Sequence, residues 1–194
     1  MSRPVPDAVI LGLLKAQPSH GYDLLERFRS EEHLGHIWRL STSQLYAVLK
    51  RLEEAGAIQG TEVEVSDAPA RREYHIKAAG EQQLHQWLLE KQPSASLHRI
   101  RVIFLSRLYI AWLLDHPVNG IFQNQIAICK KQLKDFCTVQ HRANSEIEHA
   151  ALDLVINQLS AVIDWLETYQ DAAKSDSYLH SNNFKKKDNA KEAQ

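Results

Sequence analysis

Apolar positions recur every three or four residues through the first part of the chain, which is the spacing of helices that pack one face against a core. The pattern predicts a short buried helix that ends near Ala16. A second helix is predicted over residues 21–31, with Ser19 as its cap. A loop then leads to a third helix, which runs from about Thr42 to Ala55.

The third helix has a defined start, a defined stop and two different faces. Ser41 and Gln44 are spaced as a capping box, and Gly56 can take the left-handed conformation that closes a last turn. One face is apolar and is expected to pack on the core, whereas the other is small, aromatic and cationic, with Ser43, Tyr46, Ala47 and Lys50. Such an outer face is either an ordinary solvated surface or a binding surface, and the helix alone does not decide between them.

Beyond the third helix the hydrophobic period becomes that of a strand. Val63 and Val65 alternate with glutamates, and Tyr74 and Ile76 alternate with polar residues. Two strands are therefore predicted on either side of a turn over residues 66–70.

A fourth helix, from about Ala78 to Lys91, follows the predicted hairpin. Three helices followed by a two-stranded wing make a winged helix-turn-helix. We therefore expect a mainly α chain in which residues 1–92 form a DNA-binding domain of this type.

Three long helical segments follow Pro93, over residues 97–115, 118–141 and 144–173. Apolar positions in the second step by four and three, as in the seam of a helix pair, and the last carries two apolar stripes, so that it should be buried from two sides. We predict a helical dimerisation and effector domain over residues 93–173, although the same stripes would also fit a closed monomeric bundle. The polar residues 174–194 are predicted to be a disordered tail.

Composition restricts the compartment and the partners. The net charge is −1, and residues 1–80 hold 10 Lys and Arg against 11 Asp and Glu, so bulk charge does not indicate a polyanion partner. Cys129 and Cys137 lie about 12 Å apart along one predicted helix, too far for a disulfide, and are expected to be free thiols. With no signal peptide in residues 1–7 and no apolar run long enough to span a bilayer, a cytoplasmic protein without membrane contact is expected.

Motifs for catalysis and metal binding are weak. His33 and His36 have no Cys or carboxylate at ligand spacing. The sequence contains no Gly-rich phosphate loop, no GxSxG motif and no paired carboxylates. We therefore expect no enzyme activity, no metal and no cofactor.

The outer face of the third helix acquires a role if the domain is a winged helix-turn-helix, because the second helix of such a unit enters the major groove of DNA. The candidate DNA-binding residues are Thr42, Ser43, Gln44, Tyr46, Lys50 and Arg51 on that helix, and Arg71 and Arg72 after the wing's turn. Glu62, Glu64 and Asp67 make the wing acidic, so affinity should be weak and salt-sensitive at one half-site. A dimer that holds two half-sites would compensate.

Aromatic residues are the candidates for an effector pocket between the two domains. They are Trp38, Trp87, Tyr109, Trp112, Trp165 and Tyr169. Aromatic residues at helical spacing are more often ordinary core. If they line a cavity, its ligand is expected to be a small aromatic molecule.

The segments HGYDLLERF, LSTSQLYAVLKRLEEAGAI, RREYHI and AAGEQQLHQWL resemble, in order, the winged-helix domain of the PadR family, from Ala8 to about Lys91. The three following helices are similar to the longer C-terminal domain of the subfamily that includes the virulence-gene activators. The resemblance implies a homodimer that binds an inverted-repeat operator in double-stranded DNA and releases it on a signal.

We therefore expect a sequence-specific DNA-binding transcriptional regulator, a homodimeric repressor released by a small molecule or a stress signal. The alternatives are an activator of the same family, a winged-helix protein-interaction module without DNA binding, and a small-molecule carrier built on the helical arm.

Overall fold

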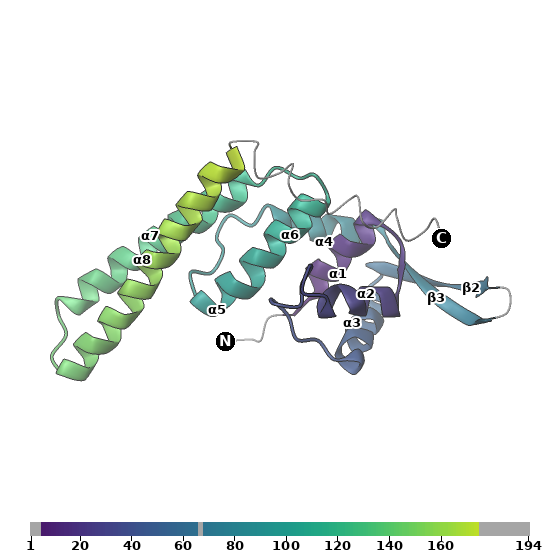
Figure 1. Ribbon diagram of the computed structural model, residues 1–194, viewed down its shortest axis with the longest axis horizontal. Coiled ribbons are helices and arrows are strands. Elements are labelled where there is room, and N and C mark those ends of the chain that lie inside the picture. Colours follow the sequence, from purple (N-terminus) through teal and green to yellow (C-terminus); the bar gives the residue numbers. More distant parts are fainter. Residues whose placement is uncertain (1–4, 66–67, 175–194) are drawn as a thin grey trace. The chain divides into compact units, whose positions relative to one another are not determined.

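The computed structural model describes residues 5–65 and 68–174. The chain divides into two compact units: unit 1 comprises residues 1–90 and 98–116, and unit 2 comprises residues 91–97 and 117–194. The mainly helical architecture predicted from the sequence, with a small antiparallel sheet, is confirmed (Figure 1). The predicted tail, apart from its first residue, lies outside the described residues.

Unit 1 begins with three helices that carry the predicted apolar faces. They are α1 (Asp7–Ala16), α2 (Gly21–Arg29) and α3 (Thr42–Glu54). Leu24 on α2 and Leu45 on α3 are buried in the core, as is Ile10 on α1. At the end of α3, Gly56 has a φ of 67°, so the left-handed closing residue predicted from the sequence is confirmed.

The wing has one strand more than predicted. The strand order is β1-β3-β2, all antiparallel, formed by β1 (Ser19–His20), β2 (Ile58–Val65) and β3 (Ala68–Ile76). The predicted cap at Ser19 is wrong, because Ser19 pairs with Tyr74 in the sheet and α2 begins after His20 without a side-chain cap. β3 also begins at Ala68, inside the predicted turn, and residues 66–67 of that turn lie outside the described residues.

The first long helical segment differs from the sequence prediction in shape and in grouping. It consists of α5 (Leu97–Arg99), the π-helical turn η1 (Ile100–Phe104) and α6 (Leu105–Leu113). Residues 98–116 belong to unit 1, although the predicted division at residue 93 placed them with the other long helices. Contacts between α6 and both α1 and α4 (Ala78–Leu88) account for this grouping. Assigning separate functions to the two parts of the chain stays a prediction.

Unit 2 is built on a helical hairpin of α7 (Asn119–Gln140) and α8 (Glu146–Lys174) (Figure 1). The predicted seam is buried where Phe122, Ile126 and Cys129 on α7 meet the apolar side of α8. Lys130 also pairs with Glu167 at 2.6 Å across the two helices, at an exposed position.

Two apolar side chains near the start of α8 are exposed among the described residues, one of them, Leu154, from the second predicted stripe. Leu154 is 58% exposed and Ile147 is 78% exposed. Both cysteines are free, as predicted from their spacing. Among the described residues, no helix is long and apolar enough to cross a membrane.

Candidate nucleic-acid interface

The outer face of α3 is open to solvent along its length. Thr42, Ser43, Ala47 and Lys50 are exposed, and Tyr46 is 46% exposed. The core residues Leu45 and Leu49 occupy the opposite side. The structure therefore brings the predicted groove-facing side chains of α3 onto one accessible surface.

The start of α3 is held by the capping box predicted from the sequence. The Gln44 backbone N–H donates to the Ser41 hydroxyl at 3.2 Å, and the Ser41 backbone N–H donates to Gln44 Oε1 at 2.9 Å. The Gln44 carbonyl oxygen is therefore occupied by the cap, whereas its amide N–H₂ group keeps two donors. While the cap is in place, Gln44 is therefore best suited to donate at a base edge.

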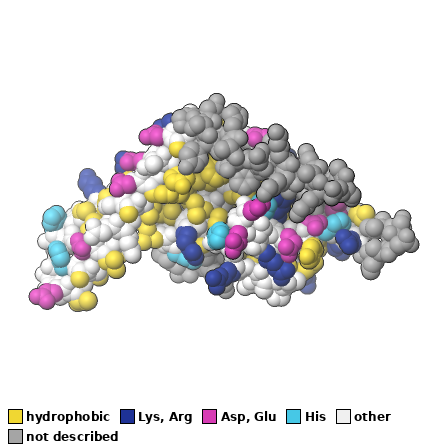
Figure 2. Space-filling model, viewed as in Figure 1, with side chains coloured by type: hydrophobic (Ala, Val, Ile, Leu, Met, Phe, Trp, Pro, Cys, Tyr) yellow, Lys and Arg dark blue, Asp and Glu magenta, His cyan; other side chains and the backbone are white. Residues whose placement is uncertain are grey.

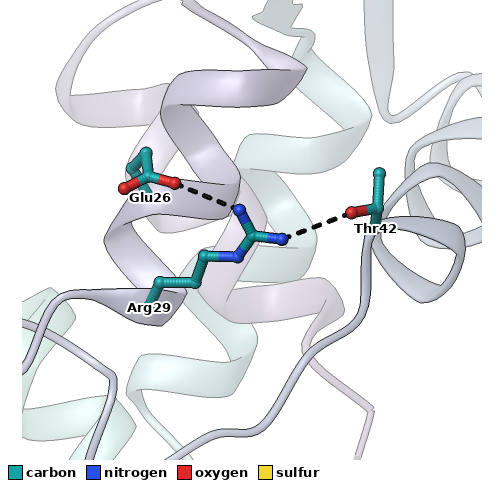
Figure 3. A network of polar contacts seen from close by, with 3 residues as sticks. All are labelled: Glu26, Arg29 and Thr42. Atoms are coloured by element: carbon teal, nitrogen blue, oxygen red, sulfur yellow. Dashed lines mark hydrogen bonds and ion pairs between the residues drawn. The ribbon is translucent and has the colours of Figure 1, made fainter.

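Arg29 joins the end of α2 to the start of α3, and the sequence analysis missed it. Its Nη1 donates to Glu26 Oε1 at 3.3 Å and its Nη2 donates to Thr42 Oγ1 at 3.4 Å (Figure 3). The spacing of Glu26 and Arg29 indicated only an ordinary helical pair, since nothing in the sequence connects Arg29 with Thr42. The guanidinium adds a positive charge at the corner where α3 begins.

The base of the wing is braced on the end of α3 by Arg72. Arg72 Nη2 donates to Glu53 Oε1 at 2.7 Å, the same oxygen that accepts the Gly60 N–H at 2.8 Å. These hydrogen bonds, chiefly the one from Arg72, hold the pKa of Glu53 below its ordinary value. The Arg72 guanidinium also lies over the Tyr74 ring, 5.9 Å from its centroid. Arg71 and Arg72 are both exposed, but Arg72 is already engaged by partners within the protein.

The two remaining cations of α3 have partners of different strength. Lys50 Nζ lies 3.8 Å from Glu54 Oε1, and both side chains are well exposed, so this pair exchanges readily with an external anion. Arg51 pairs directly with Asp7 at the start of α1. Arg51 is therefore positioned on one flank of α3, not at its outer midline.

A recess of about 640 Å³ lies on the wing side of α3, between the start of α2 and β3. Tyr46, Arg71 and Tyr74 line it. Gly21 permits the close approach of α3, because a Cβ built there would lie 2.8 Å from the Tyr46 hydroxyl oxygen. Tyr46 and Arg71, predicted from separate parts of the sequence, thus share one recess.

The candidate effector residues fall into both units. In unit 1, Trp38 is buried and donates from Nε1 to the Ser106 hydroxyl at 2.7 Å, and the Tyr109 hydroxyl lies 3.2 Å from His33 Nδ1. Trp87 is covered by the guanidinium of Arg107 at 5.2 Å.

Trp112 is the last of these residues in unit 1, and its buried Nε1 has no hydrogen-bond partner among the described residues. Trp165 and Tyr169 belong to unit 2, where their ring centroids are 4.6 Å apart. A shared effector cavity stays a prediction. The part of the chain that the structure describes holds no group of three His, Cys, Asp or Glu side chains placed to bind a metal ion.

The fold of unit 1 is that of a winged helix-turn-helix protein. It has three helices, a wing braced on α3, and an exposed outer face on α3, the second helix of the helix-turn-helix unit. The model of the transcriptional regulator PadR-like family matches residues 10–86. The negative transcriptional regulator PadR of Bacillus subtilis (strain 168) is 31% identical over 132 residues, 65% of this chain and 68% of that protein. The chain belongs to the PadR-like family of transcriptional regulators, which confirms the resemblance and the predicted class.

Two solved structures of a relative are similar in fold. Bacillus subtilis PadR in complex with operator DNA matches with a TM-score of 0.44 and 24% identity, over 86% of this chain and 97% of that one. The same protein in complex with p-coumaric acid matches with a TM-score of 0.41 and 22% identity, over 90% of this chain and 99% of that one.

Proposed function

We propose that this protein is a homodimeric, sequence-specific DNA-binding repressor that acts in the cytoplasm and releases its operator when a small aromatic effector binds. The observation that carries the proposal is the exposed outer face of α3, a helix whose start is held by a capping box, in a member of a transcriptional regulator family. The Bacillus subtilis relative is named a negative regulator and has been solved with operator DNA.

In the proposed complex, the first turns of α3 enter the major groove. Thr42, Ser43 and Gln44 then face base edges, while Lys50 lies farther along the groove. Arg71 extends from the wing toward the DNA backbone. Arg72 acts indirectly, because its bond to Glu53 sets the angle of the wing.

Self-association is supported by the two exposed apolar side chains near the start of α8. Ile147 and Leu154 are seven residues apart and therefore lie on the same side of the helix. A second copy packed on this side would bury both side chains and hold two copies of α3 at a fixed separation. Two weak half-sites held in this way bind far more tightly than one.

We propose a small aromatic effector because the Bacillus subtilis relative has been solved with p-coumaric acid, a small aromatic acid. Binding can release DNA only if the ligand prefers a conformation in which the half-site spacing does not match the operator. No catalytic step is assigned to any residue.

The test compares substitutions on and off the proposed surface. We expect Lys50→Ala to weaken binding to a duplex from upstream of the protein's own gene. The fall of log affinity with log salt should also become shallower, by about one unit of slope. Lys131→Ala, which removes an exposed lysine of α7, should leave both unchanged. Equal behaviour of the two variants would contradict the assignment of α3.

A second candidate, a winged-helix module that binds a protein, is favoured by the charge balance. On the face drawn in Figure 2, Lys and Arg side chains alternate with Asp and Glu and do not form one basic patch. Glu62 is also exposed on the wing. This candidate predicts no difference between operator and scrambled duplexes.

A further inference from the structure

A second recess, of about 720 Å³, borders α3 on the side away from the wing. We call it the flank recess. Gln44, Ala47, Val48 and Arg51 form its α3 wall, the loop before α3 forms another, and His98, Arg101 and Val102 contribute from α5 and η1. All of these residues belong to unit 1.

The two recesses lie on opposite flanks of the exposed face of α3. The exposed residues Ser43, Ala47 and Lys50 define the midline of this face. An α-helix advances about 100° per residue, so Gln44 and Arg51 project roughly 80° to one side of that midline. Tyr46, which lines the wing-side recess, projects roughly 70° to the other side. A helix seated in the major groove would therefore turn one recess toward each of the two strands that border the groove.

The rim of the flank recess is cationic. Arg39, Arg51 and Arg101 line it together with two histidines, and no Asp or Glu is among its lining residues. Arg51 is paired with Asp7. Arg39 and Arg101 are both exposed, and neither forms an ion pair within the described part of the chain. The two guanidinium groups are therefore available to an external anion.

The segments that carry the two rim arginines are joined by a buried hydrogen bond. Arg39 follows Trp38 directly, and the Trp38 indole donates to Ser106, whose hydroxyl donates to the Val102 carbonyl at 2.6 Å. Val102 adjoins Arg101 in the π-helical turn. The loop before α3 and the η1 turn are thereby joined beneath the rim, so the core sets the backbone positions from which the two arginines extend.

We propose that Arg39 and Arg101 bind backbone phosphates of the DNA strand on the side of α3 away from the wing. The inference rests on the proposed function and extends its surface beyond residues 10–86, the part that matches the family. A guanidinium group can bind a phosphate through two parallel N–H donors, whereas a lysine ammonium acts as a single point charge. Two arginines on the rim are therefore well suited to bind phosphates. The flank recess would thus be a local positive site in a domain whose charges nearly cancel.

The experiment measures binding of the full-length protein to the same upstream duplex by fluorescence anisotropy over a range of salt. Each phosphate contact contributes about 0.9 to the steepness with which log affinity falls against log salt. Arg39→Ala/Arg101→Ala should therefore make this dependence shallower by about two units of slope and weaken binding about tenfold or more. Preference for the operator over a scrambled duplex should remain, because phosphate contacts carry no sequence information. The control is Lys131→Ala/Arg142→Ala, an equal loss of two positive charges on α7 and in the turn after it, and it should behave as wild type.

Several outcomes would overturn the inference. If the double variant is folded by circular dichroism and retains the wild-type slope, the flank recess does not contact DNA, although the proposed function stands. If the wild-type protein binds no duplex, the proposed function fails as well. If benzoate binds the DNA-free protein saturably and Arg101→Ala abolishes that binding while DNA binding is unchanged, the recess is a site for small carboxylates.

Discussion

The hydrogen bond between Trp38 and Ser106 gives the sharpest prediction about stability. Trp38 is 8% exposed, its Nε1 donates to Ser106 Oγ at 2.7 Å, and Ser106 is fully buried. The bond links the loop before α3 to α6 across 68 residues of sequence. Ser106→Ala removes the acceptor while changing the packing very little, so the indole N–H would be buried without a partner.

An unsatisfied buried donor costs its full desolvation penalty, so Ser106→Ala should lower the free energy of unfolding by about 1–3 kcal/mol. Trp38→Phe should also cost about 1–3 kcal/mol, mostly from the volume lost beside Phe28. In the Trp38→Phe background no indole remains to be satisfied. Ser106→Ala should then cost less than about 0.5 kcal/mol, because within the described residues the hydroxyl's one other bond is to the Val102 carbonyl one turn back.

The assay is urea denaturation of the four proteins of this double-mutant cycle, followed by far-UV circular dichroism so that loss of an indole does not alter the signal. We expect a coupling energy of about 1–2 kcal/mol between Trp38 and Ser106. If Ser106→Ala costs the same in both backgrounds, the hydrogen bond does not stabilise the fold and the reasoning is refuted.

Three further predictions concern packing, pH and assembly. Gly80→Ala should cost about 1–3 kcal/mol of unfolding free energy in the same assay, because its Cβ would lie 2.3 Å from the Ala57 carbonyl oxygen. The control Gly120→Ala, whose Cβ would meet nothing within 4 Å, should be neutral, and equal costs would contradict this. Because the pKa of Glu53 is lowered in the folded state, the ionised side chain stabilises the fold; this contribution is complete above the ordinary glutamate pKa and is lost as the pH falls through the folded value. The difference in unfolding free energy between the wild type and Glu53→Gln should therefore shrink over that range, and a constant difference would refute the prediction. Leu154→Asp should convert the proposed dimer to a folded monomer in analytical ultracentrifugation, and an unchanged sedimentation coefficient would remove α8 from the interface.

Features whose causes lie within a few residues were predictable from the sequence. The capping box of Ser41 and Gln44 and the closing turn at Gly56 depend on local spacing, and both are present. The seam of α7 followed from a repeat of four and three, since that repeat places its side chains on one side of any helix.

Features that depend on the approach of distant segments were not predictable. Ser19 has the right chemistry for a helix cap, yet pairing with Tyr74 in the sheet prevailed over the local preference. The bond from Arg29 to Thr42 and the engagement of Arg72 by Glu53 require the folded arrangement of separate elements. The sequence could therefore identify the exposed face of α3, but not which cations around it already have internal partners.

The most direct test of the central claim is fluorescence anisotropy of the wild-type protein on a duplex from immediately upstream of its own gene, with a scrambled duplex of the same composition, from low to physiological salt. We expect binding to the upstream duplex to be about a thousandfold tighter than to the scrambled one, with affinity that falls steeply as salt rises. Equal affinity for the two duplexes, on this promoter and on its neighbours, would contradict it and favour the protein-interaction module.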